Sequence, residues 1–262
     1  MPLSGGSIAQ VEAVDLADER RVVVKTGAKG LPLEARMLVY LAEYSELPVP
    51  RVFLVRKGLL VMEFLPGSTR LDADSETHAA ELLAGLHAVT SDRFGFDYDT
   101  VIGGLPQPNP RTEKWIPFFR DERLLLMARD CHHAGKLDIR LMTRLEHFAG
   151  KLEDLLEEPT RPSLVHGDMW GGNILSEGGG IAGFLDPAIY FAHAEIELAF
   201  SMLFGTFGEP FFKRYHEIRP IRPGFFESRK DIYNLWHLLT HVRLFGASYL
   251  AGIERVLTRH GV

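Results

Sequence analysis

The chain has 262 residues, 46% of them hydrophobic, and a formal net charge of −6 at pH 7. A chain of this length buries about three quarters of its unfolded surface, which is enough for two lobes that share their packing. The acidic balance argues against nucleic-acid binding, which uses basic patches. We expect neither a signal peptide nor a membrane span, and the single cysteine permits no internal disulfide. These features indicate a cytoplasmic protein, which we expect to be a monomer.

A glycine turn near the start of the chain is the first candidate for phosphate binding. Gly5, Gly6 and Ser7 precede a run of strand-forming residues at 8–15. The turn can therefore offer backbone N–H groups to phosphate oxygens. By itself such a turn is a weak signal.

A lysine closes the second predicted strand. Residues 20–25 are charged and then β-branched, and the run ends in Lys25, which can pair with the phosphates of ATP if it points inward. A solvated lysine that closes an edge strand fits the same residues equally well. Apolar residues within 33–41 recur at helical spacing, and Glu34 of this helix can pair with Lys25 and hold it toward the phosphates.

Two more strands complete the predicted sheet. Residues 49–55 and 58–64 are apolar runs with many β-branched side chains. The second run leads into a hinge, where the backbone groups of Glu63 and Leu65 can meet the edge of an adenine ring. We therefore expect residues 1–64 to form a small antiparallel β-lobe with one helix, and this lobe to bind ATP.

Beyond the hinge, the apolar spacing becomes helical. Asp74 or Ser75 can cap a helix that runs to about Val89. His87 lies near the apolar face of this helix, where a satisfied core histidine is more common than a ligand. Residues 65–262 are expected to form a larger, mainly helical lobe for catalysis and acceptor binding, which makes the fold α+β. The other expected helices cover 117–130, 138–157, 194–205 and 229–257.

The most informative stretch of the chain ends at Asp186. Asp168 is followed five positions later by Asn173, and Asp186 stands thirteen positions beyond Asn173. Kinase-like folds gather their phosphoryl-transfer groups at this spacing. An aspartate can accept the proton of the attacking hydroxyl, so Asp168 is the candidate base. Magnesium takes oxygen ligands and also binds substrate phosphates, so Asn173 and Asp186 are its candidate ligands.

Simple turn-forming roles are the alternative for these three residues, since Asp, Asn and Gly dominate turns. Each residue alone would favour that alternative, but their joint spacing after two apolar runs favours phosphoryl transfer. Only eight residues separate Asp186 from Glu195, which is too few for an activation loop that docks a peptide. A protein kinase is therefore disfavoured.

Together with further blocks, these residues resemble the fructosamine or ketosamine 3-kinases, relatives of the aminoglycoside and choline kinases within the protein-kinase-like fold. The resemblance covers nearly the whole chain. Its most specific parts are Trp170 inside the catalytic loop (residues 166–173) and the Asp-Pro-Ala-x-Tyr block at 186–190, where other kinases usually carry different residues. The remaining blocks are Phe94-Gly95-Phe96, Ile102 to Asn109, Trp115 to Phe119, Arg123-Leu124, Glu195, Leu203-Phe204-Gly205 with Phe207, His241, Phe245-Gly246 and Tyr249.

The resemblance implies ATP-dependent phosphorylation of the 3-hydroxyl of ketosamines, the adducts that form when a sugar reacts with an amine and rearranges. Such 3-phosphates are unstable and release the free amine, so the implied role is deglycation repair of glycated protein or small amines. The resemblance also implies roles for the residues singled out above: Asp168 as the base, Lys25 and Glu34 at the phosphates, and Asn173 and Asp186 at Mg²⁺.

The acceptor side of the site is less well specified. By resemblance Trp170 faces the sugar adduct, and a core tryptophan that packs the loop is the alternative. Ser7 stands where relatives often carry cysteine, so redox-linked dimerisation through that site is not expected. Ala194 and Thr240 replace a basic residue and an asparagine that are common in relatives. These departures leave the identity of the acceptor more open than the type of reaction.

Two other functions stay open from the sequence. A kinase of the same fold can act on an aminoglycoside, choline or another small alcohol. A non-catalytic nucleotide-binding protein is less compatible, because the residues that inactive relatives tend to lose are all present: Lys25, Asp168, Asn173 and Asp186. The acceptor, a small ketosamine or a glycated protein amine, is not specified by any motif.

Overall fold

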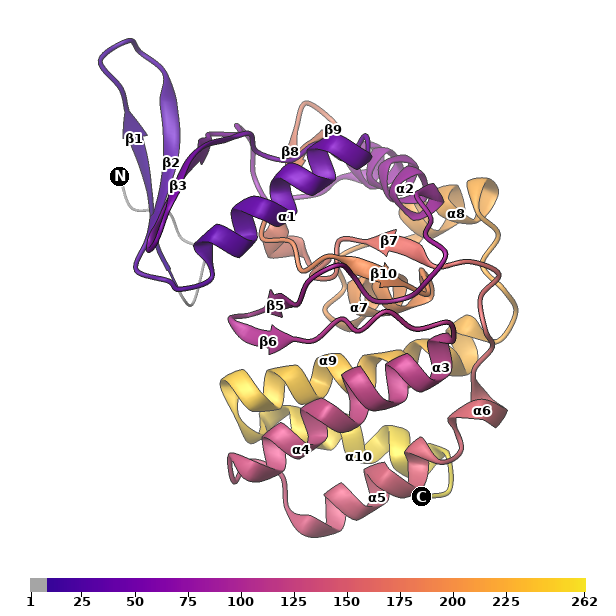
Figure 1. Cartoon of the computed structure of the whole chain (residues 1–262). Coiled ribbons are helices and arrows are strands. Elements are labelled where there is room, and N and C mark those ends of the chain that lie inside the picture. The colour runs from indigo at the N-terminus through magenta and orange to yellow at the C-terminus, as the bar shows by residue number, and fades with distance from the viewer. Residues whose placement is uncertain (1–8) are drawn as a thin grey trace.

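Residues 9–262 are described by a computed structural model, in which a small sheet stands beside a larger, mainly helical part (Figure 1). The sheet has four antiparallel strands in the order β1-β2-β4-β3. Its strands are β1 (Gln10–Asp15), β2 (Arg21–Thr26), β3 (Val52–Arg56) and β4 (Leu59–Glu63). The predicted glycine turn at Gly5, Gly6 and Ser7 lies outside the described residues.

Helix α1 (Leu31–Tyr44) packs against this sheet. It begins after Gly30 with a proline in its first turn, where the missing N–H breaks no helical hydrogen bond. Its apolar face forms a small core with Val23 of β2 and Leu60 of β4. Because side chains alternate along a strand, Lys25 lies on the same face of β2 as Val23 and is directed toward α1. The lysine is therefore buried and does not close a solvated edge.

The rest of the chain consists of helices and short strand pairs, and the α+β class is confirmed. The strand pairs are antiparallel: β5 (Thr100–Ile102) with β6 (Leu105–Gln107), β7 (Ser163–Val165) with β10 (Tyr190–Ala192), and β8 (Ile174–Glu177) with β9 (Gly180–Phe184). The helices are α2 (Ala73–Ala88), α3 (Trp115–Phe118), α4 (Leu126–His133), α5 (Ile139–Ala149), α6 (Leu152–Leu155), α7 (Glu195–Leu203), α8 (Glu209–Ile218), α9 (Lys230–Phe245) and α10 (Leu250–Arg259).

Helix α2 is capped by a different residue from the one predicted. The Asp72 carboxylate accepts a hydrogen bond from the Ser75 backbone N–H (2.9 Å), and the Ser75 hydroxyl accepts one from the Asp72 N–H (2.8 Å). This is a capping box with Ser75 in the third helical position, so the prediction of Asp74 or Ser75 as the cap is wrong.

The two longest predicted helices are each interrupted, and one helix was missed. The predicted helix at 138–157 is divided between α5 and α6. The predicted helix at 229–257 is divided between α9 and α10, and the break begins at Gly246. This residue has a φ of 99°, which a glycine adopts without strain. Helix α8 was not predicted. Between α3 and α4, the chain forms a π-helical turn at Phe119–Leu125.

The hydrophobic core of the helical part reaches into α1. Met37 and Leu41 of α1 belong to this larger core, so α1 contacts both cores. The predicted lobe boundary between residues 64 and 65 stays a prediction. Among residues 9–262, no helix combines the length and the apolar character needed to cross a membrane.

Candidate active site

The loop that carries Asp168 leaves a fully buried strand. All three residues of β7 are buried, and the strand pairs with β10. After it, Gly167 has a φ of 85°, and a Cβ atom at this position would collide with the Ala188 carbonyl. The Ala188 N–H donates to the His166 carbonyl (2.8 Å). Only glycine fits here, so the turn that presents Asp168 is fixed by the backbone.

Asn173 holds the Asp168 side chain in place. Its amide nitrogen donates to the Asp168 carbonyl (2.9 Å) and to Asp168 Oδ2 (3.0 Å). Both bonds use the Asn173 amide nitrogen, so a cation would be bound by Oδ1. The Asp168 side chain is half-buried, and burial raises the pKa of this carboxyl to about 7 against the opposing effect of the Asn173 hydrogen bond. Asp168 therefore has the acidity of a base that works near neutral pH.

Asp186 is the second residue after the end of β9. Its φ of 52° is left-handed, a conformation that aspartate tolerates better than most residues. Leu185, which precedes it, donates its N–H to the Asn173 carbonyl (2.8 Å), so the two segments are joined. The Asp186 carboxylate accepts a hydrogen bond from the Lys25 amine. Lys25 of β2, the segment that follows β9 and the catalytic loop therefore meet at one place.

Lys25 is shared between two carboxylates. Its amine donates to Glu34 Oε1 of α1 (2.7 Å) as well as to Asp186. Burial acts to lower the pKa of Lys25, but the carboxylates of Asp186 and Glu34 outweigh it and leave this pKa raised. Burial raises the pKa of Glu34 to about 6, although Lys25 acts in the other direction. The predicted pairing of Lys25 with Glu34 is confirmed.

The hinge residues lie at the end of the sheet. The Glu63 N–H donates to the Arg51 carbonyl (2.8 Å), and its side chain pairs with Arg51 Nε (3.2 Å). The Glu63 side chain is thus engaged by Arg51, and the role of the Glu63 backbone at adenine stays a prediction. The Leu65 side chain packs so closely over Gly183 of β9 that a Cβ atom there would collide with it. This contact joins the hinge to the strand that leads to Asp186.

Trp170 is not a core residue. It is 43% exposed, and its indole lies over Gly172, where a Cβ atom would collide with the ring. The next residue, Gly171, donates its N–H to the hydroxyl of Thr206 beyond α7 (3.1 Å). Trp170 is therefore not buried in the core, although its ring packs on the loop, and its role at the sugar stays a prediction.

Glu197 of α7 supports the catalytic loop and was missed. It is buried, and its carboxylate accepts hydrogen bonds from the backbone N–H groups of Gly167 (2.7 Å) and His166 (3.2 Å). It also accepts from His87 Nε2 (2.9 Å), whose Nδ1 lies 2.7 Å from the Tyr215 hydroxyl. His87 is thus a satisfied core histidine, as predicted. Although burial acts to raise it, these hydrogen bonds hold the pKa of Glu197 below its usual value.

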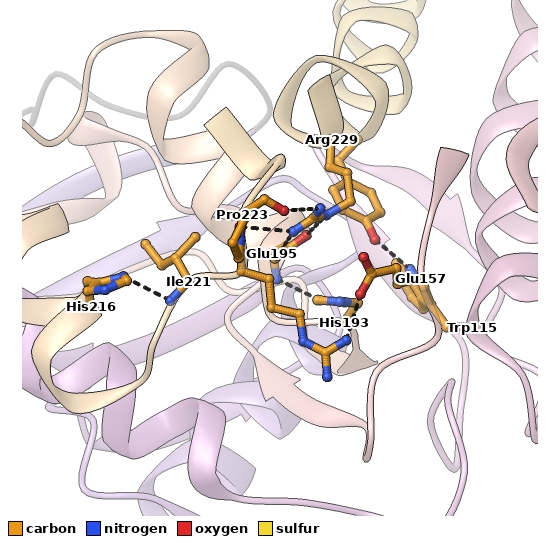
Figure 2. A network of polar contacts seen from close by, with 10 residues as sticks. Trp115, Glu157, His193, Glu195, His216, Ile221, Pro223 and Arg229 are labelled. Carbon is orange, nitrogen blue, oxygen red and sulfur yellow. Dashed lines mark hydrogen bonds and ion pairs between the residues drawn. The ribbon is translucent and has the colours of Figure 1, made fainter. Parts of the chain in front are cut away.

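A second buried carboxylate fixes the start of α7. Figure 2 shows Glu195 facing the guanidinium of Arg229, which donates through two nitrogens at 2.7 and 2.6 Å. Arg229 also donates to the Pro223 carbonyl (2.8 Å). A buried two-pronged pair of this kind sets orientation strongly. It positions α7, and with it Glu197, under the catalytic loop.

The donor set fits a magnesium ion that is bound jointly with phosphates. Asp186 and Asn173 offer hard oxygen atoms, which Mg²⁺ prefers, and the ion usually takes its remaining ligands from phosphates and water. Within residues 9–262, no group of three or more His, Cys, Asp or Glu side chains is arranged to hold a metal. A self-sufficient metal centre is therefore not seen in the described part of the chain.

Two named relatives resemble the chain over most of its length. A Vibrio parahaemolyticus protein named "Probable ketoamine kinase" is 34% identical, with 98% of this chain and 90% of that protein covered. The chloroplastic protein-ribulosamine 3-kinase of Arabidopsis thaliana is 35% identical, with 76% of this chain and 60% of that protein covered.

Solved structures give the same result for the fold. The Haemophilus somnus protein named "Putative fructosamine-3-kinase" superposes with a TM-score of 0.86 at 28% identity, covering 99% of this chain and 90% of that one. An aminoglycoside phosphotransferase superposes with a TM-score of 0.71 at 18% identity, covering 100% and 94%, which confirms the predicted kinase-like fold. The family model for fructosamine kinase matches residues 1–260. The chain therefore belongs to the fructosamine kinase family.

Proposed function

We propose that this enzyme transfers the γ-phosphoryl group of ATP to the 3-hydroxyl of ketosamines of the fructosamine or ribulosamine type. The observation that carries the proposal is the convergence of Lys25, Asp168 and Asp186 at one site of a fructosamine kinase chain. The 3-phosphate is unstable and releases the amine, so the reaction would repair glycated amines. The acceptor is a small ketosamine or a glycated protein amine. A cytoplasmic location and a monomeric state stay predictions.

Asp168 is proposed to act as the base. As the 3-hydroxyl oxygen forms its bond to the γ-phosphorus and the bond to the ADP oxygen breaks, the hydroxyl proton passes to the Asp168 carboxylate. The raised pKa of Asp168 suits this proton transfer near neutral pH. Asn173 holds the carboxylate through Oδ2, which leaves Oδ1 of Asp168 to face the hydroxyl.

The nucleotide side is proposed to use the other predicted residues. Lys25, supported by Glu34, would bind phosphate oxygens, and the backbone groups of Glu63 and Leu65 would meet adenine. The turn at Gly5, Gly6 and Ser7 would cover the phosphates, although it lies outside the described residues. Asn173 Oδ1 and Asp186 would hold Mg²⁺, which when bound neutralises phosphate charge.

The test is a comparison of acceptors at fixed ATP and magnesium. Ribulosyl, fructosyl and erythrulosyl amines are compared with an aminoglycoside and with choline, and ADP release is measured. Phosphorus NMR of the fresh product then locates the phosphate. We expect turnover with at least one ketosamine and phosphate on oxygen 3. Turnover only with the aminoglycoside or with choline would overturn the proposal.

A further inference from the structure

A group of partly exposed rings lies at the end of α7 and is not used by the mechanism above. It comprises Phe204, His241, Phe245 and Tyr249, and is called here the aromatic cluster. The His241 ring lies 4.8 Å from Phe204, 5.6 Å from Phe245 and 5.0 Å from Tyr249, measured between ring centroids. Phe204 is 43% exposed and Phe245 is 56% exposed. Apolar rings open to water next to one another indicate a binding surface.

The cluster is tied to the catalytic loop. Phe204 directly follows α7, and two residues later the Thr206 hydroxyl accepts a hydrogen bond from the Gly171 N–H (3.1 Å). Gly171 follows Trp170, the exposed residue of the catalytic loop. Beneath Phe204, the rings of Phe200 and His237 stack at 4.0 Å and 11°, so the base of the cluster is rigid. A substrate that reaches Asp168 past Trp170 therefore finds this surface beside it.

The cluster carries aromatic faces and a neutral acceptor. His241 Nδ1 donates to the His237 carbonyl (2.7 Å), since a carbonyl can only accept, and this leaves Nε2 as a lone-pair acceptor. Burial lowers the pKa of His241, which favours this neutral form. Aromatic faces carry negative partial charge and attract cations. A complementary ligand therefore combines an N–H cation with an apolar substituent.

We propose that the aromatic cluster binds the amine end of the ketosamine, that is, its ammonium group and the substituent on the nitrogen. This inference rests on the proposed function. In a ketosamine the nitrogen is joined to sugar carbon 1, and the reacting hydroxyl is on carbon 3 of the same chain. When that hydroxyl lies at Asp168, the nitrogen must lie on an adjacent surface. The substituent beyond it then reaches the rings of Phe204 and Phe245.

Two ketosamines with the same sugar test the proposal. Ribulosyl-benzylamine offers an aromatic substituent to the cluster, and ribulosyl-methylamine offers only a methyl group. In Phe204→Ala, we expect KM for the benzyl adduct to rise about three- to tenfold, the loss expected from a cation–π or stacking contact. KM for the methyl adduct should rise less, and KM for ATP should stay within twofold of the wild type.

Two further variants make the result specific. Phe245→Ala truncates the most exposed ring of the cluster, so it should fold normally and should shift the benzyl-to-methyl KM ratio in the same direction. Phe226→Ala is the matched control, because Phe226 is 42% exposed but its ring contacts are with Phe212 and Phe225. The control should leave the ratio unchanged. Melting curves for all three variants show whether each one is folded.

The outcomes separate this inference from the proposed function. Turnover of both adducts with an unchanged KM ratio in Phe204→Ala and Phe245→Ala would overturn the role of the cluster and leave the kinase assignment intact. An equal shift in the Phe226→Ala control would also overturn it. If the wild type phosphorylates fructosyl but not ribulosyl amines, the benzyl and methyl adducts of fructose replace the ribulosyl pair in the same comparison. If it phosphorylates no ketosamine but does phosphorylate an aminoglycoside or choline, the proposed function fails and this inference fails with it.

Discussion

The Asp168 carboxyl has a pKa of about 7, and Asn173 holds it in one orientation. We expect Asp168→Asn to lower kcat by about 10² to 10⁴, because an amide cannot take the proton of the hydroxyl. ATP affinity should change little, since the residue serves the acceptor. Steady-state kinetics and calorimetric titration with ATP measure the two quantities. Activity within threefold of the wild type would contradict the assignment of Asp168 as base.

The raised pKa of Asp168 also predicts a stability effect. In the folded protein this pKa is about 7, whereas an unfolded aspartate has a pKa of about 4. Between these values the folded wild type binds more protons than the unfolded chain, so it loses stability as pH rises. Asp168→Asn lacks this titration, whereas Glu34, whose pKa is also raised, is present in both proteins.

The melting temperature of Asp168→Asn relative to the wild type should therefore increase as pH rises from about 4 to about 7, and should level off above that range. Differential scanning calorimetry across this range measures the difference. A constant difference would show that the Asp168 carboxyl has an ordinary pKa in the folded protein.

Trp170 lies beside the candidate base and is open to solvent. If it forms a wall of the sugar site, Trp170→Ala should raise KM for a ribulosyl amine about three- to tenfold, in line with the loss of one aromatic contact. KM for ATP should move little. A drop in melting temperature with equal effects on both substrates would instead show that the indole serves mainly to pack over Gly172.

At the scale of elements, sequence patterns predicted what depends on nearby residues. In the four sheet strands and in α1, the apolar residues recur at the spacing typical of a strand or a helix, and each element lies close to its predicted range. Helix α8 was missed because it has only two buried residues, Phe211 and Tyr215, among charged neighbours. The helix predicted at 138–157 is broken because the chain turns at Gly150. The apolar residues keep their helical spacing across this glycine, so the sequence pattern does not show the break.

Helix α7 illustrates what sequence could not provide. Glu197 lies between apolar residues from Ile196 to Phe200, and this position signals a buried acid with a partner. Its partner His87 is 110 residues away, and such a pairing cannot be derived from spacing. The catalytic spacing from Asp168 to Asn173 was visible because it lies within one loop. The support beneath that loop comes from two distant helices, and only the fold reveals it.

Glu197→Gln tests this support. The amide would direct N–H groups at donors that now bind a carboxylate, and losing a hydrogen bond to a charged group costs about 1.5–3 kcal/mol. We expect a melting temperature lower by about 2–4 °C for each kcal/mol lost, and a lower kcat with little change in KM for ATP. Glu254→Gln is the matched control, because Glu254 is exposed. Wild-type kcat in Glu197→Gln would show that the loop does not need this anchor.

At the scale of the whole molecule, the active site is assembled from parts far apart in the chain. The Lys25 to Asp186 contact spans 161 residues and joins the sheet to the strand that precedes the metal-ligand candidate. The motifs at both ends were recognisable, but their contact depends on how the sheet packs. The Phe184 N–H donates to the Pro48 carbonyl (2.8 Å), and Leu65 packs over Gly183, so β9 is held from the hinge side as well.

This arrangement predicts that nucleotide and metal bind together. Because Lys25 neutralises the Asp186 carboxylate, magnesium alone should bind weakly. The ATP phosphates can attract the Lys25 amine and leave the Asp186 carboxylate for the ion. Asp186→Ala should therefore weaken binding of ATP in the presence of magnesium by about 10- to 100-fold, the range seen when even an outer-shell partner of a metal is lost.

The control for Asp186→Ala is the same titration in EDTA, where the two proteins should bind ATP with affinities within a few-fold of each other. Isothermal calorimetry gives both constants, and a melting curve confirms that the variant is folded. The loss of the Asp186 carboxylate also frees the Lys25 amine to bind phosphate, because the two groups are in contact in the wild type. This gain acts against any general weakening of ATP binding in EDTA. Equal affinity for magnesium-bound ATP in the variant and the wild type would show that Asp186 only orients Lys25 and that the metal is held elsewhere.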